Sequence, residues 1–325
     1  MTTTTEPPVV SAGERPPPPP APPAPPPPRP PSRMPRSLAP RAELSTTQRI
    51  ARAVLALVAA VTLLFVAYLA GFSHLQHLVA QQRLDSLFRA QLAAGTAPVS
   101  EGTYEDVLLA DGAPVARLQI PSIGVDEIVA EGTTSPDLMG GPGHRRDTVL
   151  PGQQGVSVLM GRASAFGGPF GRLQELPPGA NVTVTTGQGV QTFKVLGLRY
   201  AGDPSPAPLT TDEARLILET ARGPAFLPHG VLRVDAELVS DVQPPGGRQT
   251  RTATLPAEAR EMAGDRSTAW ALVLALQLLV VVELGAVWAT RRVGARQAWV
   301  VFVPLTFLAA LLVADQTARL LPNLL

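Results

Sequence analysis

Three long apolar stretches constrain the fold of this 325-residue chain more than any other feature of the sequence. The first, residues 54–72, contains no charged side chain. As a helix it would extend about 28 Å, close to the thickness of a bilayer core. Similar stretches follow at 269–290 and 298–314. We therefore expect transmembrane helices over residues 50–72, 268–290 and 298–314.

Arginines lie next to the first stretch and between the second and third. Arg49 and Arg52 precede the first stretch, and Arg291, Arg292 and Arg296 lie in the short loop between the second and the third. Arginine-rich short loops stay in the cytoplasm. Both groups of arginines therefore predict a multi-pass plasma-membrane protein with a cytoplasmic N-terminus. The first span would act as an uncleaved anchor in contact with membrane lipid. The topology then places 291–297 inside, and 73–267 and a short tail over 315–325 outside.

One ionisable residue, Glu283, lies within the second predicted span. A carboxyl group in lipid is costly and often marks a functional position. The alternative is a neutral or helix-paired group near the inner face, about two turns from Arg291. The sequence leaves both interpretations open.

The segment before the first span is rich in proline: 17 of the chain's 36 prolines fall within its first 40 residues. Proline lacks the N–H group that helices and sheets require. We therefore expect residues 1–49 to form a disordered cytoplasmic tail of polyproline character. It could dock on domains that recognise proline-rich ligands, or act as a spacer.

Composition excludes several classes of function. The chain has no cysteine, and its net charge of +1 divides into +5 over residues 1–100, −7 over 101–245 and +3 over 246–325. The absence of cysteine excludes disulfides, thiolate metal sites and a cysteine nucleophile. A balanced charge argues against nucleic acid as a partner. No cofactor is predicted.

An amphipathic helix is predicted over residues 73–100. Apolar residues recur there at mostly three- and four-residue spacing, which is typical of one helix face. The helix could pack on the following domain or stand as a stalk. The apolar positions are Leu75, Leu78, Leu84, Leu87, Phe88 and Leu92.

The sequence over residues 101–240 is typical of a small β domain. Its short segments are rich in β-branched residues and are separated by Gly/Pro turns, which predicts about seven strands in a closed barrel or sandwich. One short helix is expected over 169–176, and residues 241–267 form a linker back to the membrane. The predicted strands are 116–120, 125–129, 156–160, 181–186, 190–200, 215–220 and 230–239.

Short motifs in this block resemble those of the sortase family and occur in the same order as in the family. They are IPSIGV at 120–125, EGT at 131–133, GPGH at 141–144, VLPGQQG at 149–155, and VLMGRASAFGGPFGRLQEL at 158–176 followed by PPGANVTV. Sortases are membrane-anchored cysteine transpeptidases of Gram-positive bacteria. They cleave a sorting signal of the Leu-Pro-x-Thr-Gly type and join the protein to the cell wall.

The resemblance covers about residues 115–240 and implies a mostly β chain: a closed eight-stranded sortase-like β-barrel outside the membrane, beside three transmembrane helices. The proline-rich tail and first anchor resemble actinobacterial, class E-like members.

The family's catalytic positions differ in this chain. Arg162 stands where the resemblance places a histidine, and Ala221 stands where it places the cysteine. The position of the family's arginine corresponds to Val231, with Arg233 or Arg222 as substitutes. A methyl group cannot attack a carbonyl, and arginine cannot serve as a general acid at physiological pH. The resemblance therefore implies a domain without sortase catalysis.

Another nucleophile is the alternative. Ser157, Ser164 and Thr220 carry hydroxyls, and His144 or His229 would have to approach one of them. Without such a pair, Arg162, His144, Thr220 and Ser164 are candidates for lining a ligand groove.

Metal binding is weakly supported by the sequence. His74 and His77 are three residues apart but have no third ligand nearby, so ordinary juxtamembrane histidines are favoured. Asp126, Glu127 and Glu131 could line a calcium site, as in some sortases, but a solvated acidic face is favoured. We predict no metal site.

Three functions follow. The favoured one is a catalytically inactive sortase-like protein of the cell envelope, which binds or assembles surface proteins or wall components. Its partners would be an active sortase, a sorting-signal protein or a cell-wall component. The second is a hydrolase or transpeptidase with a non-cysteine nucleophile. The third is a structural membrane component whose spans carry the function.

Overall fold

The computed structural model describes residues 2, 3, 5, 45–103, 107–267 and 269–325. The predicted disorder of the proline-rich tail therefore lies almost wholly outside the described residues. Contacts divide the chain into Met1–Ala51 and Arg52–Leu325. All tertiary contacts below lie within the second unit.

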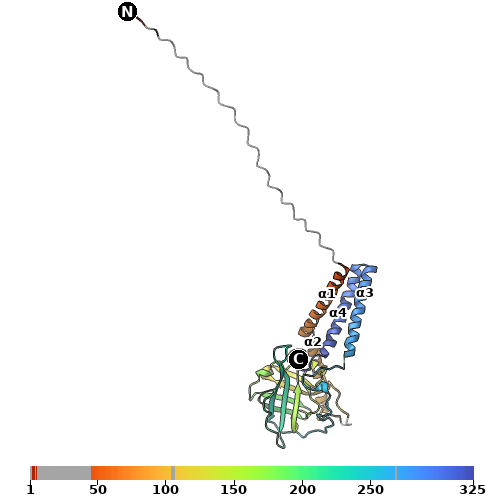
Figure 1. Ribbon diagram of the computed structural model, residues 1–325. Coiled ribbons are helices and arrows are strands. Elements are labelled where there is room, and N and C mark those ends of the chain that lie inside the picture. Colours follow the sequence, from red (N-terminus) through yellow and green to blue (C-terminus); the bar gives the residue numbers. More distant parts are fainter. Residues whose placement is uncertain (1, 4, 6–44, 104–106, 268) are drawn as a thin grey trace. The chain divides into compact units, whose positions relative to one another are not determined.

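Three helices are long and apolar enough to cross a membrane, which confirms the prediction of three such segments. Figure 1 shows them as α1, α3 and α4. Helix α1 (Thr46–Ala67) passes through one π-helical segment, Tyr68–Phe72, into α2 (Ser73–Ala94). Together they form one helical run of 49 residues. Helices α3 (Ala269–Arg292) and α4 (Ala295–Arg319) follow the barrel.

Helix α2 packs on the barrel through part of the predicted apolar stripe. Leu84 and Phe88 are buried against Ile128, whereas Leu75 is 57% exposed. The Gln81 side chain accepts a hydrogen bond from the Ile128 N–H and donates one to the Ile128 carbonyl. Strand β2 has little pairing on this side, so an amide side chain satisfies its backbone groups.

The barrel is closed, as the sequence predicts, in the order β1-β2-β3-β4-β7-β8-β6-β5. The pairs β2–β3 and β4–β7 are parallel, and the others are antiparallel. The strands are β1 (Pro114–Ile120), β2 (Val125–Glu131), β3 (Gly143–His144), β4 (Gly155–Met160), β5 (Asn181–Thr186), β6 (Gly189–Tyr200), β7 (Ala214–Arg222) and β8 (Gly230–Leu238).

Two elements differ from the expectation. Strand β3 has only two residues, too short for an alternating pattern to reveal it. The helix predicted over 169–176 is reduced to a 3-10 turn, Leu173–Glu175. Gly167 and Gly168 have left-handed backbones before it, and the proline after Leu176 favours the extended backbone found there.

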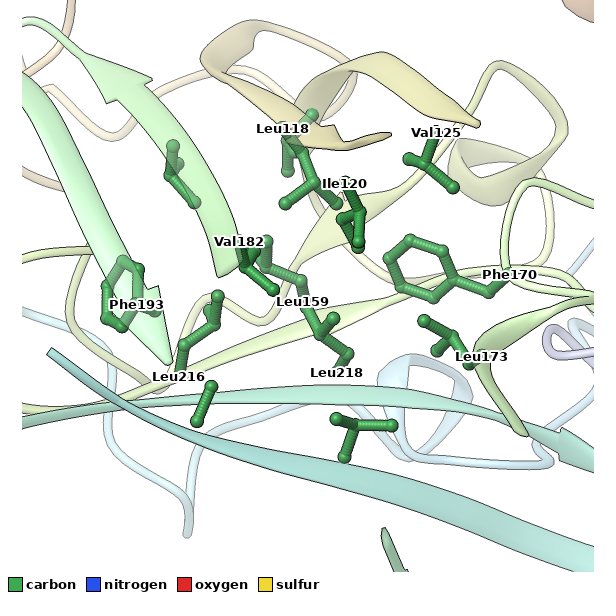
Figure 2. Packing of buried hydrophobic residues seen from close by; sticks show 14 of the residues in the cluster. Leu118, Ile120, Val125, Leu159, Phe170, Leu173, Val182, Phe193, Leu216 and Leu218 are labelled. Carbon is green, nitrogen blue, oxygen red and sulfur yellow. The ribbon is translucent and has the colours of Figure 1, made fainter. Parts of the chain in front are cut away.

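Alternating side chains fill the barrel interior, where Phe170, Phe193, Leu216 and Leu218 meet (Figure 2). Since side chains on a strand alternate between faces, the burial of Leu216 and Leu218 directs Ala221 to the outer face of β7. On β8, Leu232 and Val234 likewise point inward. Val231 and Arg233 therefore share the outer face with Ala221.

Helices α3 and α4 pack closely through small and branched side chains. Ala275 and Leu279 of α3 meet Ala310 and Val313 of α4 in one buried cluster. Leu64 of α1 packs against the same cluster. Small residues at such contacts allow close helix approach in lipid.

Candidate functional site

Several positions that the sequence predicts to be functional lie at the outer face of β4, β7 and β8. Strands β4 and β7 run parallel with Met160 opposite Glu219, and the Gly161 N–H extends the ladder to the Glu219 carbonyl at 3.0 Å. Ala221 lies opposite Val231 across β7 and β8. The residue after Gly161, Ala221 and Val231 thus lie at one end of three neighbouring strands.

Arg162 is fully buried and its guanidinium contacts oxygen atoms of three residues in two segments. Nε donates to the Leu138 carbonyl at 3.2 Å, and Nη2 donates to the Ser135 carbonyl and to Ser135 Oγ, both at 2.8 Å. Nη1 donates to the Pro322 carbonyl at 3.4 Å. The guanidinium also lies 4.9 Å from the ring centroid of Phe166.

Burial lowers the pKa of the Arg162 guanidinium to about 9, so the group still carries its charge at neutral pH. Within the described ranges, no carboxylate forms an ion pair with it. Carbonyl oxygens and an aromatic face compensate the buried charge instead. Arg162 therefore holds the loops around the site together and presents no free cation to solvent.

Ala221 lies in an apolar cluster on the outer face, together with Leu138, Met160 and Leu324. A cavity of about 260 Å³ opens beside it, lined by Ala163, Ser164, Phe170, Gly171, Gln174, Thr220, Ala221, Gly223, Pro224, Ala225 and Leu232. The structure thus retains a small pocket at the end of β7, where the resemblance places the nucleophile.

The hydroxyls of this pocket are bonded to backbone groups. Thr220 Oγ1 donates to the Gly161 carbonyl at 2.9 Å, and Ser164 Oγ accepts the Phe226 N–H at 3.3 Å. In the described part of the chain, neither hydroxyl bonds to an imidazole. Activation of a hydroxyl requires a neighbouring base. The pocket as it stands offers hydrogen bonds but lacks an activated nucleophile.

His144 is fully buried and both ring nitrogens are engaged elsewhere. Nδ1 lies 3.0 Å from Glu131 Oε2, and Nε2 lies 2.9 Å from the Val149 carbonyl and 3.3 Å from Thr148 Oγ1. This network joins β2, β3 and the turn that follows. His144 therefore acts here as a structural residue rather than as a base for Ser164.

The two arginines considered as substitutes also have partners. Arg233 Nε donates to Glu219 at 2.7 Å and its Nη2 to Glu261 at 3.0 Å. Arg222 is exposed, and its guanidinium lies 4.3 Å from the ring centroid of Tyr200. Arg233 thus lies on the same outer face as Ala221. Its bond to Glu261 joins that face to the linker.

The acidic and histidine candidates for metal binding form ordinary ion pairs. Asp126 binds Arg117 through two hydrogen bonds of 2.8 Å, and His77 Nε2 lies 3.0 Å from Glu127. Across the described ranges, no three such side chains gather as metal ligands would.

In the helical region, Glu283 accepts a hydrogen bond from Thr306 Oγ1 at 3.1 Å. Both residues line a cavity of about 750 Å³ among α1, α3 and α4. The helix-paired interpretation of Glu283 agrees with this contact.

The segments that cover the site are not evident in the sequence pattern, which predicts a short tail over residues 315–325 and a linker over 241–267. Leu324 and Met262 nevertheless contribute to the apolar cluster around Ala221. One signal was available. Leu320, Leu321, Leu324 and Leu325 follow the last helix, Pro322 interrupts any continued helix, and four leucines outside a membrane require a surface to cover them.

The fold and the site define a class of protein: a closed β-barrel with a pocket at the end of a central strand pair, in one chain with three helices long enough to span a membrane. Residues 118–224 match the family model of the sortase domain. The barrel region is thus similar to the sortase domain.

Curated and solved proteins are similar to the same region. Sortase D of Bacillus subtilis (strain 168) is 30% identical over 105 residues, which are 32% of this chain and 52% of the relative. The chain thus matches about half the length of that relative.

Among solved structures, a Clostridium perfringens sortase D5 transpeptidase is 19% identical with a TM-score of 0.40, covering 50% of this chain and 98% of the other. Sortase E1 of Streptomyces coelicolor, solved with a tripeptide in the active site, is 22% identical with a TM-score of 0.35, covering 46% and 98%.

Proposed function

We propose that this chain is a membrane-anchored sortase-like protein of the bacterial cell envelope that binds rather than cleaves. One observation carries the proposal. The pocket at the end of β7 has a methyl group, Ala221, at the expected nucleophile position, and its hydroxyls bond to backbone atoms. Such a site can hold a peptide by hydrogen bonds and apolar contact, but it cannot form an acyl intermediate.

The proposed partners follow from this binding role. They are a sorting-signal protein, an active sortase or a cell-wall component, any of which would contact the outer face of β7 and β8. Residues that sequence analysis assigned to the groove divide into two groups. Ser164 and Thr220 line the pocket. Arg162 and His144 are fully buried and are not among its lining residues.

A membrane topology is part of the proposal, with the N-terminus in the cytoplasm and the barrel outside. Leu57 and Ala295 line one cavity, and Tyr68 bonds to Asp315, so α1 runs alongside α4 in the same direction. The start of α1, near Arg52, and the arginine-rich turn between α3 and α4 therefore lie at the same end of the helices. The positive-inside rule assigns that end to the cytoplasm.

Turnover of a fluorogenic peptide of the Leu-Pro-x-Thr-Gly type tests the catalytic part. We expect no cleavage by the full chain in lipid nanodiscs. Cleavage that Ser164→Ala or His144→Ala abolishes would establish the alternative, a hydrolase or transpeptidase with a hydroxyl nucleophile.

Isothermal titration tests the binding part. We expect the full chain to bind a sorting-signal peptide or a wall fragment. If neither probe produces a binding heat, the binding role is wrong. The absence of cysteine also permits a topology test with single introduced thiols. Ala225→Cys should react with an impermeant maleimide on intact cells, and Val293→Cys should not.

A second candidate function, a membrane component whose helices carry the activity, is favoured by the cavity around Glu283. Partner capture from solubilised membranes distinguishes it. Loss of the partner with Glu283→Ala, but not with Arg162→Ala, would favour this function over the peptide-binding role.

A further inference from the structure

The last six residues of the chain lie on the candidate site. Helix α4 ends at Arg319, and Leu324 and Leu325 then join the loop after β4: the Ala163 N–H donates to the Leu324 carbonyl at 2.9 Å, and the Ala165 N–H donates to the Leu325 oxygen at 3.3 Å. These bonds attach the tail, residues 320–325, to the segment directly after Arg162.

Asn323 fixes the middle of the tail. It is fully buried, and its Nδ2 donates to the Thr133 carbonyl at 2.7 Å and to the Arg260 carbonyl at 2.8 Å. Its N–H donates to the Ala263 carbonyl at 2.9 Å. One side chain thus joins the tail, the segment after β2 and the linker.

Apolar contact completes the arrangement. Leu324 is fully buried among Leu138, Met160 and Ala221, and Leu325 is 7% exposed. The tail also bends, because the Leu325 N–H donates to the Pro322 carbonyl at 3.1 Å. A short Leu-Pro-Asn-Leu-Leu turn therefore fits the outer face through backbone hydrogen bonds, one buried amide and one buried leucine, as a bound peptide would.

We propose that the tail is a resident peptide ligand of this face, and that the face accepts a second peptide of similar chemistry only when the tail has left. The external ligand would be a short peptide with an amide side chain followed by leucine, as Asn323 and Leu324 provide here. This inference rests on the proposed peptide-binding function and adds self-occupancy to it.

The tail can leave the face without unfolding of the barrel. The tail contributes no strand to the barrel, so it can detach while the eight strands stay paired. A face that the tail occupies most of the time binds an external ligand with an apparent affinity equal to the intrinsic affinity multiplied by the fraction of chains whose face is free. Removal of the tail should therefore increase the affinity for an external peptide, although no new contact with that peptide forms.

Thiol reactivity tests self-occupancy directly, because the chain contains no cysteine of its own. Ala221→Cys places one thiol beneath Leu324, and Ala225→Cys places one in the exposed β7–β8 loop. In the full chain we expect a maleimide to react at least about tenfold more slowly at position 221 than at 225. Deletion of residues 320–325, or Leu324→Asp, should raise the rate at 221 about tenfold and leave 225 unchanged.

Ala236→Cys, within the barrel core, is the folding control. It should stay unreactive in every variant, and the Leu324→Asp chain keeps the test valid if the deletion proves unstable. Rapid reaction at 221 in the full chain would overturn the proposal, since the tail would then leave the face open. Slow reaction at 221 after both changes would also overturn it, because something other than the tail would cover the position.

A peptide titration separates this inference from the proposed function. A synthetic Leu-Leu-Pro-Asn-Leu-Leu peptide should slow the reaction at 221 in the truncated chain about tenfold, and it should bind the truncated chain at least about fivefold more tightly than the full chain. Equal affinity for both chains would overturn self-occupancy while leaving the binding function in place. No binding to either chain, by this peptide, a sorting-signal peptide or a wall fragment, would remove both.

Discussion

Leu324, the penultimate residue of the chain, packs in one buried cluster with Ala221, the residue at the end of β7 where the family resemblance places a nucleophile. The two residues are about 100 positions apart in the sequence. The pocket beside Ala221 and the apolar surface beneath Leu324 lie on either side of the same strand end. The candidate site is thus partly open and partly filled by the chain itself.

Truncating Leu324 to alanine should release the tail without unfolding the barrel. Loss of a buried leucine side chain costs about 2–5 kcal/mol, but only the docked state of the tail loses it. We expect carboxypeptidase to remove the terminal leucine at least about tenfold faster, while the thermal midpoint changes by less than about 2 °C. Leu227→Ala, in an exposed loop position, is the matched control and should alter neither value.

Arg162→Met should destabilise the barrel by about 2 kcal/mol. The substitution removes the cost of burying a charge, but it leaves the oxygens of Ser135 and Leu138 without their donor. Because charge-assisted hydrogen bonds are strong, we expect their loss to outweigh the gain from removing the buried charge. Urea denaturation in detergent gives the free energy of unfolding. The exposed Arg222→Met should cost less than about 1 kcal/mol. A more stable Arg162→Met chain would mean that desolvation outweighs the hydrogen bonds.

Asp137 should make the chain more stable at acidic pH. Burial raises the pKa of its carboxyl above the ordinary value, against the hydrogen bonds from Thr134. The folded chain therefore binds this proton more readily than the unfolded chain. The contribution is fully present below the unfolded pKa of about 3.9 and is lost as pH rises through the folded pKa.

Asp137→Asn should remove that contribution. The difference in unfolding free energy between the two chains, measured from pH 3 to 7, should depend on pH, with the native chain relatively more stable at the acidic end. A pH-independent difference would show that Asp137 titrates at the same pH in the folded and unfolded chains.

Tyr68→Phe should loosen the tail through the helices. Tyr68 donates a hydrogen bond to Asp315 Oδ1 at 2.8 Å, and Arg319 binds the other oxygen of Asp315 at 3.1 Å, just before the tail begins. Loss of the hydroxyl removes an anchor of the end of α4. In the Ala221→Cys background we expect maleimide reactivity to rise several-fold. Thr62→Val, which removes a hydroxyl bonded only within α1, should not change it.

Much of the architecture was predictable because it depends on local patterns. The apolar stretches predicted the three long helices, and β-branched segments between Gly/Pro turns predicted seven strands that the structure contains. The eighth, Gly143–His144, has too few residues for any periodicity. The ordered turn motifs predicted the family, and they also located Arg162 and Ala221 at positions that the structure brings to one end of the barrel.

The sequence by itself therefore determined the element types and the resemblance that predicts the barrel, because spacing and composition act within a few turns of chain. Only the tertiary structure decided which surfaces meet. Gln81 joins Leu84 and Phe88 at the α2 contact because the backbone groups of β2 need hydrogen-bond partners. The guanidinium of Arg162 points inward because loop carbonyls surround it. The tail covers Ala221 because burial of Leu324 and Asn323 depends on residues far away in the chain, which no local pattern encodes.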